Sequence, residues 1–232
     1  MSDGPVIWLG DDLIFPAVDR ADDHGLLAAG GDLRPERLVL AYSSGIFPWP
    51  HEGLPLLWFA PDPRCVFRPG DLRVSRSLRA RLRRGDYEVR FDTAFREVML
   101  GCASAPRADR LGTWITEDMV EAYCELHRRG IAHSTEAWRD GELVGGAYGV
   151  SLGGVFMGES MFARATDASK VAFVTLVRRL ADWGIDLVDG QLPTPHLESL
   201  GGQVWPRSRY LAELAVRLRR ETRRGRWKNE DA

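Results

Sequence analysis

The chain has 232 residues, and 44% of them are apolar, which is enough to bury a large hydrophobic core. The formal net charge is only -2, and no run approaches the roughly 18 apolar residues of a membrane span, so a membrane protein is excluded and a cytoplasmic location is predicted. The three cysteines are widely spaced without a Cys-x-x-Cys pair, which argues against a disulfide framework and a zinc site.

Residues 1–62 are predicted to form a small N-terminal domain. Pro-Asp-Pro at 61–63 follows an expected strand at 57–60 and marks the boundary with a larger domain over residues 63–232. Acidic side chains dominate the first segment of the chain, whereas the segment that opens the larger domain is basic.

Trp49 is predicted to stand on a rigid loop of the N-terminal domain. A Gly-Gly-Asp turn, followed by Pro35 and spaced apolar residues, predicts a short helix that ends at Gly45. The prolines at 48 and 50 then break regular structure and fix the backbone on both sides of Trp49. An indole presented in this way suits stacking on a nucleobase.

The larger domain is predicted to be α/β (α+β), with a mixed sheet flanked by helices. Strands are expected at 64–67, 87–91, 132–138, 142–150, 153–157 and 185–188. Helices are expected at 73–84, 93–103, 117–130, 168–184 and 208–222. This order resembles that of an acetyltransferase-like (GNAT) domain, although a fold of that kind identifies no substrate.

The predicted helix at 73–84 carries a basic ridge. Leu78 and Leu82 lie on one helical face and leave the arginines of this segment pointing outward. Arginine clusters of this kind neutralise phosphates, which predicts contact with a nucleic acid. The residues chosen for this nucleic-acid contact are Arg76, Arg79, Arg83 and Arg84. A solvated arginine-rich face is the alternative, and it is preferred for the second basic block at 207–228.

Two carboxylates are expected at the ends of buried strands. Glu159 follows the strand at 153–157, and Asp189 follows the strand at 185–188. A carboxylate in such a place is costly unless it is paired, hydrogen-bonded or open to a cleft. Two of them that face one cleft would make a reaction site.

Short motifs along most of the chain resemble those of the leucyl/phenylalanyl-tRNA protein transferases. They run in order as GIFPW (45–49), WFAPDPR (58–64), GCA (101–103), TWIT (113–116), HS (133–134), LVGGAYG (143–149), GESMF (158–162), ASK (168–170) and DGQ (189–191). The resemblance implies transfer of leucine or phenylalanine from aminoacyl-tRNA onto the N-terminal arginine or lysine of a protein, which marks that protein for degradation by the N-end rule. The implied partners are the charged tRNA and such acceptor proteins, with no cofactor, no metal and no membrane.

Asp189 and Gln191 are the candidate catalytic residues. Because they are two residues apart on an extended segment, we expect both side chains on one face, where Asp189 polarises the Gln191 amide and the amide oxygen receives the proton of the attacking amine. The resemblance implies the same role, and a structural hydrogen-bonded pair is the alternative. Glu159 is expected to bind the cationic acceptor terminus, or else to be a surface glutamate on a turn.

The donor needs a surface for its terminal adenosine and an apolar pocket for its amino-acid side chain. The residues chosen for stacking on the adenine are Trp49 and Trp114. The residues chosen for the apolar pocket are Met157, Met161, Phe162, Phe173 and Leu187, and they can equally belong to the core.

Two other functions stay open on the residues alone. A coenzyme-A-dependent acetyltransferase would share the fold, but its Gln/Arg-x-x-Gly-x-Gly/Ala phosphate loop is absent from the sequence. A non-catalytic tRNA-binding protein would explain the basic ridge and the aromatic loops. It leaves Glu159, Asp189 and Gln191 without a use.

Overall fold

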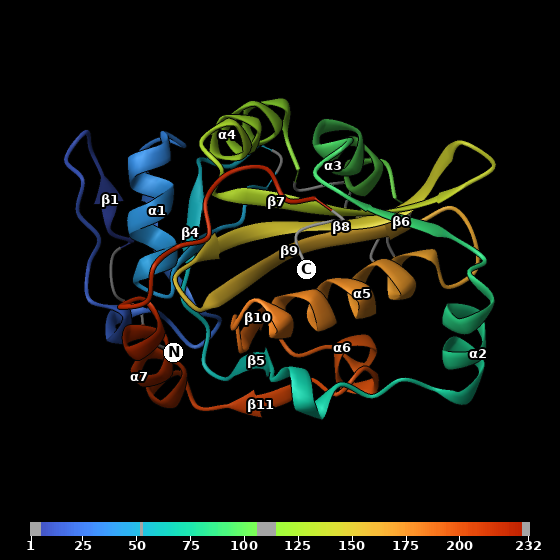
Figure 1. Ribbon diagram of the computed structural model, residues 1–232. Helices are drawn as coiled ribbons and strands as arrows, with labels where there is room; N and C mark the ends of the chain where they lie inside the picture. Colours follow the sequence, from blue (N-terminus) through green and yellow to red (C-terminus); the bar gives the residue numbers. More distant parts are fainter. Residues whose placement is uncertain (1–5, 52, 106–114, 229–232) are drawn as a thin grey trace.

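The computed structural model describes residues 6–51, 53–105 and 115–228 (Figure 1). Within these ranges the chain forms a small sheet from its N-terminal part, a seven-stranded sheet and the helices that cover it. No helix in these ranges is long and apolar enough to cross a membrane.

The small sheet has four strands in the order β1-β2-β4-β3. Its strands are β1 (Trp8–Leu9), β2 (Leu26–Gly30), β3 (Phe47–Pro48) and β4 (Leu57–Phe59). The helix α1 (Pro35–Ser43) connects β2 to β3 and begins with its proline, where the missing N–H costs no hydrogen bond. Gly45 follows the helix with a φ of 75°, a conformation that glycine adopts without strain.

The large sheet has the strand order β11-β5-β10-β9-β8-β7-β6. Its strands are β5 (Arg64–Phe67), β6 (Glu88–Phe91), β7 (Ala132–Arg139), β8 (Glu142–Leu152), β9 (Val155–Ala163), β10 (Leu187–Gln191) and β11 (Gln203–Trp205). Neighbouring strands are antiparallel except for β9 and β10, which are parallel.

Helices cover both faces of the large sheet. They are α2 (Arg76–Arg84), α3 (Phe95–Ala103), α4 (Glu117–Arg128), α5 (Ala168–Asp182), α6 (Pro195–Ser199) and α7 (Arg207–Arg217). Helices α3 and α4 lie on one face, whereas α5 and α6 lie on the other (Figure 1). The predicted mixed sheet flanked by helices is therefore confirmed.

The structure differs from the prediction in the bounds of several elements and in short elements that were not predicted, β1, β2 and β3 among them. β10 spans Leu187–Gln191 and not 185–188, so Asp189 lies within the strand, and α7 ends at Arg217 and not near 222. β9 runs to Ala163 and not to residue 157, because β8 pairs with it along this whole stretch. The five-residue helix α6 and the three-residue strand β11 were not predicted. Elements this short depend on tertiary contacts more than on a local pattern.

The N-terminal part shares its hydrophobic core with the large sheet. Leu38 and Trp58 from the small sheet and its helix belong to the same buried cluster as Tyr123 and Tyr148. The predicted boundary at residue 62 falls between β4 and β5, which belong to different sheets. The division into domains at that residue stays a prediction.

The Trp227 side chain packs the last described segment of the chain against the core. Its side chain is 1% exposed, and its indole stacks on His133 with ring centres 3.6 Å apart. Its backbone N–H donates to Oδ2 of Asp92 at 2.7 Å. Trp183 and Phe156 complete the aromatic surroundings of the indole.

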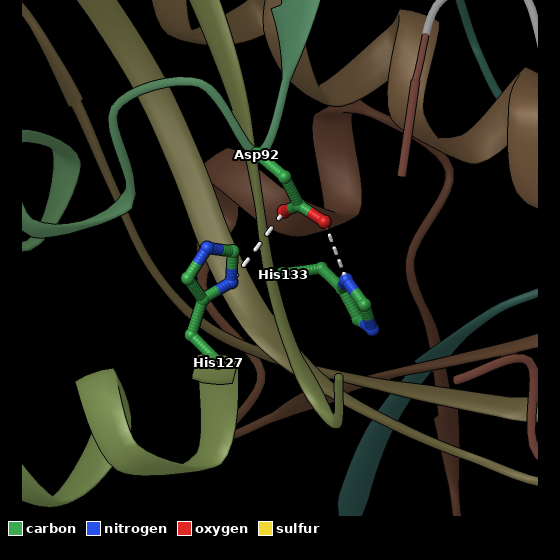
Figure 2. A group of neighbouring side chains, drawn as sticks. All are labelled: Asp92, His127 and His133. Atoms are coloured by element: carbon green, nitrogen blue, oxygen red, sulfur yellow. Dashed lines mark hydrogen bonds and ion pairs between the residues drawn. The ribbon is translucent and has the colours of Figure 1, made fainter. Parts of the chain in front are cut away.

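Asp92, His127 and His133 form the buried polar cluster that receives Trp227 (Figure 2). Nδ1 of His133 lies 2.8 Å from Asp92, and the Ser134 N–H donates to the same carboxylate at 2.8 Å. Nδ1 of His127 lies 2.8 Å from the Ala132 carbonyl oxygen. With a carbonyl or carboxylate oxygen as acceptor, each Nδ1 acts as the hydrogen-bond donor, and the cluster forms a hydrogen-bond network. Burial lowers the pKa of His133, although its hydrogen bond to Asp92 opposes this shift.

The Trp227→Ala substitution should lower the free energy of unfolding by about 3–5 kcal/mol, because it removes a large buried side chain and leaves a cavity. Chemical denaturation of the purified protein measures this change. Trp8→Ala is the matched control, because Trp8 is 67% exposed and its loss should change stability by less than about 0.5 kcal/mol. Equal effects of the two substitutions would contradict the role given to Trp227.

Candidate active site

A cavity of about 290 Å³ opens where the pairing of β9 with β10 stops. The two strands pair up to Met157 and Asp189, and Gly158, Glu159 and Gly190 just beyond line the cavity. The apolar walls come from Phe67, Phe156, Met161, Phe173, Leu176 and Val188. This volume is at the lower end of the range for small-molecule sites, and it is sufficient for one amino-acid side chain.

Both strands contain a β-bulge beside this cavity. Glu159 is the extra residue of β9 opposite β8, and Gly190 is the extra residue of β10 opposite β5. A bulge interrupts the alternation of side chains and redirects those that follow it. Gln191, directly after the second bulge, has a φ of 61°, which is uncommon for a residue with a Cβ atom.

Asp189 is completely buried, and its carboxylate is held by Arg64 and Tyr210. Nε and Nη2 of Arg64 donate to its two oxygens at 2.8 and 2.6 Å. The Tyr210 hydroxyl donates to Oδ2 at 2.8 Å, and burial raises the pKa of this tyrosine well above its usual value. The Asp189 carboxylate therefore faces protein groups, although the residue contributes to the cavity lining.

The predicted contact between the Asp189 carboxylate and the Gln191 side-chain amide is wrong. The group that donates to Oδ1 of Asp189 is the backbone N–H of Gln191, at 2.8 Å. The side-chain Nε2 of Gln191 donates instead to Oε1 of Glu159, at 2.7 Å. The bulge at Gly190 is the physical reason, because it removes the regular alternation on which the prediction depended.

Glu159 is 9% exposed and accepts hydrogen bonds from two directions. Besides Gln191, the hydroxyl of Tyr123 donates to it at 3.2 Å, and Tyr123 is itself hydrogen-bonded to Tyr42. The residue lies within β9, so the alternative of a surface glutamate on a turn is excluded.

The two carboxylates of the site differ in their charge partners. Arg64 neutralises Asp189 through a buried ion pair. Within residues 6–51, 53–105 and 115–228, no lysine, arginine or histidine forms an ion pair with Glu159. Burial raises the pKa of Glu159 to about 7, even though its hydrogen bonds to tyrosine and glutamine oppose that shift. Among the described residues, Asp189 therefore has a cationic partner and Glu159 has none.

The structure divides the predicted apolar residues into two groups. Met161 and Phe173 line the cavity, as a donor pocket requires. Met157, Phe162 and Leu187 are buried in the core cluster between the sheets and helices, so the core alternative describes their position.

A second cavity, of about 100 Å³, lies beside Trp49. It is lined by Phe47, Pro48, Trp49, Glu159, Gln191 and Leu192. Glu159 lines both cavities and therefore lies between them. The Trp49 ring packs edge-on against Phe59, with ring centres 5.4 Å apart. Trp114, the other predicted stacking residue, lies outside the described residues.

The basic helix α2 has the predicted apolar face. Ser75 caps its start by accepting the Leu78 N–H at 3.2 Å, and Gly85 ends it with a φ of 68°. Leu78 is buried and Leu82 is half-buried. The arginines on the exposed side are Arg76, Arg79, Arg83 and Arg84. Arg84 donates to Asp86 at 2.8 Å, so part of its charge is already balanced.

Four residues that hold the carboxylates were not predicted. They are Tyr42, Arg64, Tyr123 and Tyr210. Arg64 did carry a signal, because a charge inside an apolar strand must have a buried partner. The tyrosines gave none, since each lies on a helix where an aromatic residue is equally typical of the core.

Comparisons with known proteins show the family of the chain. The family model described as "Leucyl/phenylalanyl-tRNA protein transferase" matches residues 66–215, and the model of the N-terminal domain of that family matches residues 31–62. A relative from Myxococcus xanthus is 56% identical over 225 residues, which is 96% of this chain and 96% of the relative. A relative from Stutzerimonas stutzeri is 59% identical over 216 residues, which is 92% and 95% of the two chains. Both relatives are named as leucyl/phenylalanyl-tRNA--protein transferases.

These matches identify an aminoacyltransferase that takes its donor from tRNA. The chain belongs to the family of leucyl/phenylalanyl-tRNA protein transferases, which transfer leucine or phenylalanine to protein N-termini in the N-end rule. The family predicted from the short motifs is confirmed, which decides against both alternative functions.

Solved structures resemble the fold only loosely. A GCN5-related N-acetyltransferase from Kribbella flavida has a TM-score of 0.40 and 13% identity, over 74% of this chain and 61% of the other. A structure described as L-PGS from Bacillus licheniformis also has a TM-score of 0.40, with 12% identity over 70% and 52% of the two chains. The assignment rests on the family models and the relatives.

The Glu159→Gln substitution should remove a pH dependence of stability. Folding raises the pKa of Glu159 from its usual value to about 7. At pH values between the two, the folded protein therefore binds more protons than the unfolded chain. The wild type should therefore lose up to about 3 kcal/mol relative to the glutamine variant as pH rises from about 4.5 through about 7. Denaturation of both proteins at several pH values measures this difference, and parallel stability profiles would contradict it.

Proposed function

We propose that the two cavities hold two parts of the donor, its amino-acid side chain and its terminal adenosine, and that the acceptor amine reaches the donor ester beside Gln191 and Glu159. The larger cavity would take the leucine or phenylalanine side chain of the donor, with Met161 and Phe173 among its walls. The second cavity would take the terminal adenosine beside Trp49. The single observation that carries this proposal is the 2.7 Å hydrogen bond between Gln191 and Glu159. Glu159 lines both cavities and Gln191 lines the second, so this bond connects the linings of the two cavities.

Gln191 is proposed to receive the acceptor amine. Its Nε2 donates to Glu159, which directs the other atom of the amide, the acceptor Oε1, away from that carboxylate. The neutral α-amine attacks the ester carbonyl carbon, a C–N bond forms, and the ester bond to the ribose oxygen then breaks, while the proton lost by the amine nitrogen ends on that leaving oxygen to give the ribose hydroxyl. Since the pKa of an α-amino group is about 7.7–8.0, roughly a tenth of it is neutral near pH 7. A hydrogen-bond acceptor that orients the amine is then sufficient, and no strong base is required.

Glu159 is proposed to bind the arginine or lysine side chain of the acceptor protein. A carboxylate with no cation beside it in the described structure can form a charge-assisted hydrogen bond with a guanidinium or ammonium group. A bound cation favours the ionised carboxylate, so acceptor binding would lower the pKa of Glu159 from its value of about 7.

The exposed arginines of α2 are proposed to bind the phosphates of the donor tRNA. They stand on a rigid, capped helix and face away from the core, as a phosphate-binding ridge requires. Because the donor is a charged tRNA, we also propose the cytoplasm as the location and no membrane partner.

The Gln191→Ala variant should transfer leucine from leucyl-tRNA to a peptide with N-terminal arginine about 100- to 10,000-fold more slowly in a single turnover. The loss follows from removing the amine acceptor, so donor binding should change little. Raising the pH should recover only part of the rate, because it supplies neutral amine but no orientation. Peptides that begin with aspartate or alanine serve as controls and should react poorly with the wild type. Near-normal rates from a folded Gln191→Ala protein would overturn the role of this residue.

Replacement of Arg76, Arg79 and Arg83 by glutamine should weaken binding of leucyl-tRNA and flatten its salt dependence, because phosphate contacts release counterions. Reaction with a minimal aminoacyl-adenosine donor should stay near the wild-type rate. The matched control replaces Arg219 and Arg224, which are exposed in the second basic block. An unchanged salt slope in the α2 variant would show that this helix is only a solvated face, and a flattened slope in the control alone would assign tRNA binding to the C-terminal block.

A further inference from the structure

Arg64 is a buried arginine that contacts two segments far apart in the sequence. Its side chain is 1% exposed at the first residue of β5. Nε and Nη2 donate to Asp189 at 2.8 and 2.6 Å, while Nη1 donates to the Gly45 carbonyl oxygen at 2.9 Å. The rings of Phe47 and Tyr210 lie within 5.0 and 4.6 Å of the guanidinium carbon.

Only arginine can make this set of contacts. The guanidinium offers donors in a fixed planar fork, so two of them grip a carboxylate while a third reaches in another direction. A lysine ammonium is a point charge that cannot bond both Asp189 oxygens and the Gly45 carbonyl from one position. Two flanking aromatic rings further restrict where the group can lie.

The two segments that Arg64 joins both lead into residues that line the second cavity. Gly45 begins the loop that places Phe47, Pro48 and Trp49 in this lining. Asp189 accepts the backbone N–H of Gln191 and so holds that residue in its uncommon conformation.

We propose that Arg64 is a positioning residue that sets the spacing between the Trp49 loop and Gln191. Tyr210 is a second positioning residue, which acts on Gln191 alone through Asp189. Neither side chain is expected to touch a substrate, because both are almost completely buried. The Asp189 carboxylate is likewise an anchor for the Gln191 backbone. This inference rests on the proposed function, in which the acceptor amine reaches the donor ester beside Gln191 and Glu159.

Two variants separate the two connections. Tyr210→Phe removes one hydrogen bond to Asp189 and should lower the single-turnover rate about tenfold, with donor affinity unchanged. Arg64→Lys disturbs both segments, so it should lower the rate about 100-fold and also weaken binding of a non-reactive aminoacyl-adenosine analogue. Tyr87→Phe is the matched control, since it removes a buried tyrosine hydroxyl that donates to the Thr166 carbonyl, and its rate should equal that of the wild type.

A double-variant comparison distinguishes positioning from general destabilisation. If Tyr210 acts through Gln191 alone, then Tyr210→Phe should slow the Gln191→Ala protein by no more than about twofold further. Arg64→Lys should slow that protein by clearly less than about 100-fold, because only its effect on the Trp49 side is independent of Gln191. Arg64→Lys should still weaken analogue binding in that background, because the Gly45 contact is independent of Gln191.

Every result of this experiment is decisive. The inference is overturned if the rate loss of a double variant equals the product of the losses of its two single variants, or if Tyr210→Phe has a normal rate. Both results can be obtained with Tyr210→Phe even if Arg64→Lys fails to fold. If the wild type transfers no leucine, or Gln191→Ala keeps its rate, the proposed function fails first. A slow Gln191→Ala protein beside fast Arg64→Lys and Tyr210→Phe proteins would overturn the positioning roles alone.

Discussion

The buried ion pair between Arg64 and Asp189 is the constraint on which the rest of the site depends. Burying two charges costs several kcal/mol for each ion, and the cost is offset only by good geometry and by hydrogen bonds to the remaining donors and acceptors. Arg64 and Asp189 meet that condition through the two-point contact, the Gly45 carbonyl and the Tyr210 hydroxyl. A pair satisfied in this way has a single favourable arrangement. It therefore fixes the position of β10 relative to the loop before β3.

The larger cavity lies at a local departure from regular pairing in the sheet. β9 and β10 are parallel neighbours over only three residue pairs, and the larger cavity begins where this pairing stops. The bulges at Glu159 and Gly190 lie at the same place and turn the Glu159 and Gln191 side chains toward each other. The irregular backbone thus coincides with the polar groups that need a defined direction.

The contrast between Asp189 and Glu159 shows how one site can contain two carboxylates with different tasks. The charge of Asp189 is balanced inside the protein by Arg64. Glu159 has neutral hydrogen-bond donors, Tyr123 and Gln191 among them, and burial raises its pKa to about 7. If the proposed role of Glu159 holds, a basic acceptor would supply the charge partner that the carboxylate lacks among the described residues.

The sequence by itself determined the family, the mixed sheet and most helix bounds. It also singled out Glu159, Asp189 and Gln191 as candidate site residues. Those features are local, because periodicity, caps and short motifs express them within a few residues. Only the tertiary structure decided which partner each side chain meets. The bulge at Gly190 directs Gln191 to Glu159 and not to the Asp189 carboxylate, and Arg64 reaches Asp189 across 125 residues of sequence. Contacts of that kind depend on strand register and chain topology, and no local pattern encodes them.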